Sequence, residues 1–589
     1  MAPQQHGAEE VWRTLSDAGV SHCFINPGTS ELWLASALCH SDITPVLCLH
    51  EGVCAGAADG FARVSSSPSS VLLHLSVGFS NAFANLHNAS KARSPVIAIV
   101  GSMSTYFQGK GAVLDHPHPR LLAEHISASV SEPSSASTVR PSLRHLVNSI
   151  DASSNSAVST SALSTRLATA VIPHNVQWQP ISEADSQRIR QEQPVSFRMF
   201  MGQSSPHDAS LPHDVLAFLA QCADALVQSS SIAFVLGGRA LIANGTLEAV
   251  SRAADTIGAA LLTEGSFARA DRGLGRPCIQ RLSYFPNDAR KELDRFEKLV
   301  LVDTRKPVAP FGYASEEGKD VLPLNDDDND DRLWTLDSED IKCVCEQLAH
   351  LLEQRTTSPI SHASSTTRNS STSERPPSLP TDNTLTPRNM CQCLAALQPE
   401  CIVVDESLTS GTHYFDLSHG CPPFMHLGLT GGAIGQGMPC ALGAALADRS
   451  CKVISLQADG SALYTLQALW SQARERADVV TIITNNGSYQ ILVRTLRLIN
   501  LFAFYNYCNK PVCTLLQRLE LAMQGIPLSD GVNDNTTALQ GLDFCSLARG
   551  LGATASRATT CSDFAQQLRD NLHQTLEGPH LIDAQLVTC

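Results

Sequence analysis

The chain has 589 residues, too many for one hydrophobic core, and this length predicts about three or four domains. Apolar residues make up 43% of the sequence and charged residues 17%, as in a globular protein with a large interior. The net charge of −15 argues against nucleic acid or an anionic membrane as the main partner. Without a signal-peptide pattern or an apolar run of membrane-spanning length, we expect a cytoplasmic protein that binds neither nucleic acid nor membrane.

The 19 cysteines follow no zinc-binding or disulfide spacing. Cys343/Cys345 and Cys391/Cys393 form two closely spaced pairs, each in an apolar, helix-like segment without a matching second half. We therefore expect buried free thiols in a reducing compartment.

The first segment, residues 1–185, opens with a helical pattern and then alternates short apolar runs with further helical patterns. The predicted strands include HCFIN, PVLCLH, SVLLHLS and PVIAIVG. Such alternation predicts a parallel sheet with crossover helices. A Ser/Thr-rich stretch at 129–165 is predicted to be a surface excursion, interrupted by the apolar helical run LRHLVNSI.

Two later segments repeat this alternation. Residues 205–355 contain IAFVLGG, AALLTE and KLVLVDTR, and residues 387–589 contain CIVVDE, CKVISLQAD, VVTIITNN and HLIDAQLV. Residues 356–386 are rich in Ser, Thr and Pro and are predicted to be a linker. The predicted fold class is therefore α/β, with three consecutive doubly wound parallel-sheet domains.

Two polar strand ends in the last segment predict a cofactor site. One strand ends at Asp459-Gly460, a helix follows from Ser461, and the next strand ends at Asn486. The helix is predicted from its apolar positions, which are Leu463, Leu466, Leu469, Trp470 and Ala473. Both strands of a β-α-β unit end at one sheet edge, so Asp459 and Asn486 should converge there and suit Mg²⁺. Gly460 admits a diphosphate to the backbone, and the helix start at Ser461 favours its charge.

Each of these features alone would predict an ordinary helix cap or turn, whereas their combination favours cofactor binding. The segment resembles the Gly-Asp-Gly…Asn-Asn motif of thiamine-diphosphate (ThDP) enzymes, with Ala458 in place of the first Gly. The resemblance implies that Asp459, Asn486 and the main-chain carbonyl of Ser488 hold Mg²⁺.

Two neighbouring segments extend the resemblance. LTGGAIGQGMPCALGAALA is similar to the segment that meets the middle of ThDP, which implies that the Gly432 carbonyl accepts the 4′-amino proton. It also implies that Ile434 wedges the cofactor into a bent shape. Thr409 and Ser410 match a turn that contacts the diphosphate. The alternative for the glycines of this segment is close helix–strand packing.

Glu51 follows a predicted strand and begins a predicted helix in PVLCLHEGVCAGAADGFAR. A lone Glu at that position is usually a partner of the helix dipole. The segment, however, resembles the pyrimidine-binding half of ThDP enzymes. That resemblance implies that Glu51 activates the cofactor by sharing a proton with a pyrimidine nitrogen, while the cofactor itself supplies the chemistry.

Within this superfamily the sequence is most similar to acetolactate synthase large subunits and then to benzoylformate decarboxylase. With the latter it shares an NPG-x-x-E turn, and Thr29 and His74 match its substrate-facing Ser and His. His74 could equally be a hydrogen-bonded strand histidine. His116 and His118 could transfer protons, although a solvated loop is favoured.

The resemblance implies decarboxylation of a 2-oxo acid followed by carboligation, as in acetolactate synthases. The alternatives are simple decarboxylation to an aldehyde and a non-catalytic ThDP-binding protein, which would not need Glu51. ThDP is expected between the first domain of one subunit and the last domain of another, in a homodimer or homotetramer. The VLGGRAL turn makes FAD possible in the middle domain, but a scaffold without flavin is favoured.

Residues 493–516 interrupt the family pattern after the Asn-Asn motif with an apolar, aromatic stretch. One interpretation is a lid that excludes water from the site. The favoured interpretation is a gene-model error, because an uncovered stretch this apolar would promote aggregation.

Overall fold

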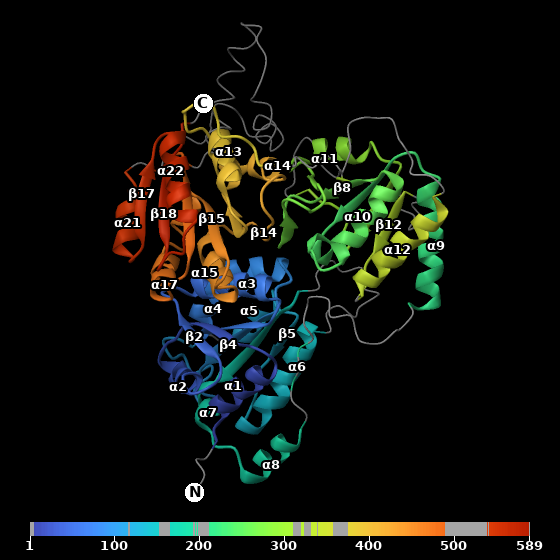
Figure 1. Ribbon diagram of the computed structural model, residues 1–589. Coiled ribbons are helices and arrows are strands. Elements are labelled where there is room, and N and C mark those ends of the chain that lie inside the picture. The colour runs from blue at the N-terminus through green and yellow to red at the C-terminus, as the bar shows by residue number, and fades with distance from the viewer. Residues whose placement is uncertain are drawn as a thin grey trace, which may run out of the picture.

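The computed structural model describes residues 5–115, 118–151, 165–192, 195, 197, 211–309, 320–322, 332–338, 340–356, 375–488, 539 and 541–587. Three helix-covered, mostly parallel sheets confirm the predicted α/β class (Figure 1). Among these residues, no helix is long and apolar enough to cross a membrane. His116, the predicted insert at 493–516 and most of the predicted linker lie outside the described residues.

The first sheet has six parallel strands in the order β2-β1-β3-β4-β6-β5. Its strands are β1 (His22–Asn26), β2 (Thr44–Leu47), β3 (Ser69–Leu73), β4 (Val96–Ser102), β5 (Ser129–Ser131) and β6 (Leu167–Pro173). Its helices are α1 (Gly7–Asp17), α2 (Leu32–Leu38), α3 (Glu51–Ser65), α4 (Leu75–Lys91), α5 (Pro119–Glu124), α6 (Val139–Asp151), α7 (His174–Trp178) and α8 (Glu183–Gln191). β3, β4 and β6 are buried throughout because helices cover both faces of the sheet.

The Ser/Thr-rich stretch at 129–165 is more than the surface excursion expected from its composition. Its first residues form the edge strand β5, which pairs with β6. The apolar run within it forms α6, which buries Leu143, Leu146 and Val147. Apolar spacing therefore decides the structure of the described part of this stretch, and overall polarity does not.

The second sheet has the order β10-β8-β7-β11-β12. Its strands are β7 (Ile232–Leu236), β8 (Ala260–Thr263), β10 (Gln280–Arg281), β11 (Lys298–Val302) and β12 (Leu333–Leu336). Its helices are α9 (His213–Val227), α10 (Thr246–Ile257), α11 (Pro286–Leu293) and α12 (Ile341–Arg355).

The third sheet has seven strands in the order β17-β18-β16-β15-β13-β14-β9. Its strands are β9 (Ala270–Arg272), β13 (Cys401–Glu406), β14 (Phe424–Gly428), β15 (Lys452–Ala458), β16 (Val479–Asn485), β17 (Thr554–Ala558) and β18 (His580–Gln585). Its helices are α13 (Pro387–Leu397), α14 (Tyr414–Leu417), α15 (Gly437–Ala447), α16 (Asp459–Ala462), α17 (Ala468–Arg474), α21 (Phe544–Gly550) and α22 (Cys561–Leu572). β9 comes from the segment predicted as the middle domain and pairs antiparallel with β14. The middle segment is thus joined to the last sheet by main-chain hydrogen bonds.

The single helix predicted after Asp459 is wrong in its extent. The chain forms the four-residue α16, leaves the helix, and resumes as α17 at Ala468. Leu463, the first of the apolar positions from which this helix was predicted, is 37% exposed.

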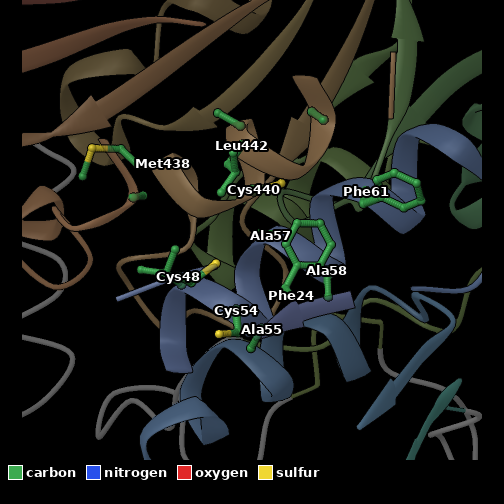
Figure 2. Packing of buried hydrophobic residues seen from close by; sticks show 14 of the residues in the cluster. Phe24, Cys48, Cys54, Ala55, Ala57, Ala58, Phe61, Met438, Cys440 and Leu442 are labelled. Atoms are coloured by element: carbon green, nitrogen blue, oxygen red, sulfur yellow. The ribbon is translucent and has the colours of Figure 1, made fainter. Parts of the chain in front are cut away.

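Helices α3 and α15 join the first and last domains within one chain (Figures 1 and 2). A Cβ built on Gly60 would overlap the Cys440 carbonyl, and one built on Gly443 would overlap the Ala57 carbonyl. Glycine at both positions therefore allows the two backbones to approach. Figure 2 shows Cys440 of α15 close to Ala57 of α3, in an apolar cluster shared by both domains.

The cysteine pairs lie where the sequence places them, in α12 and α13. All four are free thiols; Cys345, Cys391 and Cys393 are buried, whereas Cys343 is only partly buried. Burial raises the pKa of Cys345 and of Cys391 well above that of an ordinary thiol.

Candidate functional site

Glu51 is the first residue of α3, just beyond the carboxyl end of β2. The side chain of the preceding His50 caps the helix, because its Nδ1 accepts a hydrogen bond from the Gly52 N–H (3.0 Å). Glu51 is only 7% exposed, and its Oε2 accepts a hydrogen bond from Asn81 Nδ2 (3.1 Å). Its Oε1 lies close to Gly78 of α4, where a side chain would crowd the carboxylate. The structure therefore holds one nearly buried carboxylate in a defined orientation.

His74 lies one residue beyond the end of β3, at the N-cap position of α4, and it is hydrogen-bonded, as one of the two alternatives for it expected. Its Nδ1 donates a hydrogen bond to Glu31 Oε2 (2.7 Å). Glu31 is fully buried and also accepts hydrogen bonds from Ser30 Oγ (2.7 Å) and from the Gly28 N–H (3.1 Å). Because a carboxylate only accepts, Nδ1 carries the proton and Nε2 is the nitrogen left for a substrate. Thr29 is exposed on the same turn.

Asp459 and Asn486 converge as predicted from the ends of β15 and β16. Asp459 Oδ2 accepts hydrogen bonds from the N–H groups of Asn486 (3.0 Å) and Gly487 (2.9 Å). Its Oδ1 accepts a hydrogen bond from the Gly460 N–H (2.8 Å). Burial raises the pKa of Asp459 above its ordinary value, and these donated hydrogen bonds oppose the rise.

The surroundings of Asn486 bring further predicted residues to the same place. Its Nδ2 donates to Ser410 Oγ (3.2 Å), and its Oδ1 accepts a hydrogen bond from the Ser488 N–H (3.1 Å). Thr409 adjoins Ser410 on the turn after β13, and Gly460 and Ser461 are the second and third residues of α16. The potential metal ligands here are all oxygens, a carboxylate, an amide and main-chain carbonyls, which suits Mg²⁺.

The loop between β14 and α15 carries the other predicted cofactor residues. Gly432 has a left-handed backbone with φ of +74° and is exposed, and Ile434 is half-buried. The side chain of Asn88 of α4 makes two hydrogen bonds to the main chain of this loop. Its Nδ2 donates to the Ala433 carbonyl (2.7 Å), and its Oδ1 accepts from the Ala433 N–H (3.2 Å).

A second asparagine of α4 joins, within one chain, the segments that carry Glu51 and Ile434. Asn85 Nδ2 donates to the carbonyls of Gly52 (2.8 Å) and Gly435 (3.2 Å). Gly52 is the neighbour of Glu51, and Gly435 follows Ile434. These asparagines were not predicted from the sequence, although Asn81, Asn85 and Asn88 lie at i, i+4 and i+7 of a helix, a spacing that marks one polar face.

Glu406, at the end of β13, is a second residue that the sequence analysis missed. It is 1% exposed and accepts hydrogen bonds from the N–H groups of Gly435 (2.6 Å) and Gly437. Burial raises its pKa to about 7 against the opposing effect of these donors. The signal in the sequence was the acidic pair Asp405-Glu406 at the end of an apolar strand.

The Gly-Gly turn of the middle domain, Gly237-Gly238, leaves space for a neighbouring ion pair. A Cβ on Gly238 would overlap a carboxylate oxygen of Asp303, which forms an ion pair with Arg239 (2.8 Å). The glycine thus makes room for Asp303, and the prediction that this domain carries no FAD stays a prediction. His118 lies at the N-cap position of α5.

Comparison with known proteins matches both halves of the site. Residues 5–120 match the family described as thiamine pyrophosphate (another name for ThDP) enzyme, N-terminal TPP binding domain, and residues 410–512 match its C-terminal TPP binding domain. The acetolactate synthase large subunit-like protein IlvX of Mycobacterium tuberculosis is 34% identical over 586 residues, with 98% of each chain covered. Benzoylformate decarboxylase of Pseudomonas aeruginosa is 26% identical over 582 residues, with 97% of each chain covered.

Solved structures share the fold over the whole chain. The 4-hydroxybenzoylformate decarboxylase of Rhodococcus jostii RHA1 superimposes with a TM-score of 0.74 at 22% identity, covering 99% of this chain and all of that chain. Benzoylformate decarboxylase of Polynucleobacter necessarius gives 0.72 at 17% identity, with 99% of each chain covered. Two matched cofactor-binding domains and a relative 34% identical over almost the full length show that this protein belongs to the thiamine pyrophosphate enzyme family, among enzymes of the acetolactate synthase and benzoylformate decarboxylase type.

Proposed function

We propose that this protein is a ThDP- and Mg²⁺-dependent enzyme that decarboxylates a 2-oxo acid. The observation that carries the proposal is that one chain presents both parts of the required site. Glu51 is a nearly buried carboxylate at the start of α3, and Asp459 meets Asn486 at one edge of the last sheet. When bound, ThDP supplies the carbon nucleophile that this decarboxylation needs.

Each residue of the site then has a separate role. Asp459, Asn486 and the Ser488 carbonyl would hold Mg²⁺, while Gly460, Ser461, Thr409 and Ser410 would lie along the diphosphate. The Gly432 carbonyl would accept the 4′-amino proton, and Ile434 would keep the cofactor bent. Glu51 would hold a proton at the pyrimidine nitrogen.

The hydrogen bond between His74 and Glu31 favours one fate of the decarboxylated carbon. With a second proton on Nε2, taken from solvent, a histidine oriented by a buried carboxylate would be able to give that proton to the carbon, which would release an aldehyde. Simple decarboxylation, the alternative in the sequence analysis, is therefore our first candidate. Carboligation to a second carbonyl is the second candidate, and the 34% identity to the acetolactate synthase-like protein supports it.

Product analysis tests both candidates. The protein, supplied with ThDP and Mg²⁺, would be incubated with aliphatic and aromatic 2-oxo acids, with and without a second carbonyl compound. We expect release of carbon dioxide together with an aldehyde. A hydroxy-ketone or acetohydroxy acid as the main product would favour carboligation. Absence of carbon dioxide release by a protein that binds ThDP would contradict the proposal.

A further inference from the structure

Glu406 binds the backbone of the cofactor loop, although neither candidate reaction assigns it a task. Its two carboxylate oxygens accept hydrogen bonds from the N–H groups of Gly435 and Gly437. These groups flank Gln436, at the point where the loop enters α15. One buried side chain thus holds the backbone on both sides of this residue.

Other contacts hold the backbone between these two N–H groups. The Gly435 carbonyl accepts hydrogen bonds from Thr465 Oγ1 (2.7 Å) and Asn85 Nδ2 (3.2 Å). The side chain of Gln436 donates to Asp59 Oδ2 of α3 (2.6 Å). Gly435 is held in a left-handed conformation with φ of +93°. The conformation of residues 435–437 therefore depends on hydrogen bonds from several elements.

A glutamate at this buried position lowers the stability of the folded protein relative to a neutral residue. A buried carboxylate loses its hydration, and a neutral residue of the same shape loses less. Its register partner on β15 is Gln457, whose side-chain hydrogen bond to the carboxylate lowers the pKa of Glu406 and so opposes the effect of burial. A buried charge kept in spite of its desolvation points to function.

We propose that Glu406 is a positioning residue, which sets the backbone of the loop that carries Gly432 and Ile434 so that the loop receives ThDP. The inference rests on the proposed function, because that function assigns these two residues to the cofactor. Glu406 acts through the N–H groups of Gly435 and Gly437.

The variant Glu406→Gln tests this role, since its Oε1 can accept only one of the two N–H groups well. We expect calorimetric ThDP affinity to fall about 10- to 100-fold, as the loss of a hydrogen bond to a charged acceptor implies. In the cofactor-free protein, a peptide spanning 431–437 should exchange its amide hydrogens faster. The urea midpoint of the cofactor-free variant at pH 8 should not fall, because a buried charge has been removed.

The control is Glu400→Gln, which makes the same change at an exposed residue just before β13 and should alter none of the three measurements. If Glu406→Gln does not fold, Glu406→Asp keeps the charge but cannot reach both N–H groups, and it should also weaken ThDP binding. Wild-type affinity and exchange in the variant, or a urea midpoint that falls together with the affinity, would overturn the inference. A wild-type protein that binds no ThDP would instead refute the proposed function.

Discussion

The proposed activation of the cofactor requires the carboxylate of Glu51. Glu51→Gln preserves the shape of the side chain and an acceptor for Asn81, but an amide cannot take up the proton. We expect the variant to bind ThDP and to exchange the C2 proton of the cofactor about 10²–10⁴-fold more slowly. Proton NMR in deuterium oxide measures this exchange, with the exposed Glu124→Gln as control. Wild-type exchange in the Glu51 variant would reject the role.

Asp459 is the only carboxylate among the three proposed Mg²⁺ ligands. Asp459→Ala should weaken ThDP binding by more than about 100-fold, because even an outer partner of a metal ligand contributes about 10–100-fold. Calorimetry in the presence of Mg²⁺ measures the affinity, and circular dichroism checks that the variant is folded. Asp570→Ala, at an exposed acid of the same domain, is the control. An unchanged affinity in the Asp459 variant would remove it from the metal site.

The raised pKa of Glu406 predicts that the free energy of unfolding depends on pH. Its pKa in the folded protein is about 7, above the ordinary value of 4.5, so the folded protein retains a proton that the unfolded chain loses. Its stabilising contribution is therefore complete below pH ~4.5 and is lost as the pH rises through about 7, a change of up to ~3 kcal/mol. Urea unfolding between pH 4 and 8 should show this loss in the wild type.

The same measurement on Glu406→Gln isolates the effect from other groups that titrate nearby, which include Asp405, His426 and Asp459. The unfolding free energy of the variant should lack the fall that Glu406 produces. Parallel pH curves for the two proteins would show that the carboxyl group titrates normally.

Some of the site residues could be predicted from the sequence because local structure places them, whereas others depend on how the domains pack. Asp459, Asn486 and Glu51 could be predicted because they stand at strand ends, which parallel sheets bring to one edge. Asn85 could not, because its partner Gly435 is 350 residues away and the pairing depends on how two domains pack.

At the scale of elements, the crossing of α3 and α15 allows almost no room for side chains. In Gly60→Ala the new methyl group would overlap the Cys440 carbonyl. Overpacking costs about 1–3 kcal/mol, which exceeds the gain of about 1 kcal/mol in helix propensity. We expect a lower urea midpoint for Gly60→Ala, whereas Gly578→Ala, which has open space around it, should have little effect. A midpoint at or above the wild type for Gly60→Ala would show that the two helices can separate without cost.

The interruption between α16 and α17 shows why the spacing of apolar residues wrongly predicted one continuous helix here. Apolar spacing predicted one helix, but Thr465 leaves the helical path and donates to the Gly435 carbonyl. Tyr464 packs against the same glycine. A tertiary contact with the cofactor loop thus outweighs local helix propensity, and such a contact cannot be read from local spacing.

At the scale of the molecule, apolar side chains remain exposed beside both parts of the site. Leu49 and Val77 are 45% and 46% exposed near Glu51. Leu408, beside Thr409, is 43% exposed, and Tyr464, which packs against Gly435, is 55% exposed. A second subunit packed against these positions would remove this apolar surface from water. The family resemblance predicts such an arrangement, with each cofactor between two subunits.

Mixing two inactive variants tests that arrangement against a site built within one chain. If each site takes Glu51 from one subunit and Asp459 from the other, a hybrid of Glu51→Gln and Asp459→Ala subunits has one intact site. Random exchange in an equal mixture makes half of the dimers hybrids, so we expect about one quarter of wild-type activity. Sedimentation with one labelled variant confirms that hybrids form, and each variant mixed with itself should stay inactive. If hybrids form and the mixture stays inactive, the Asn85 bridge between Gly52 and Gly435 marks a site within a single chain.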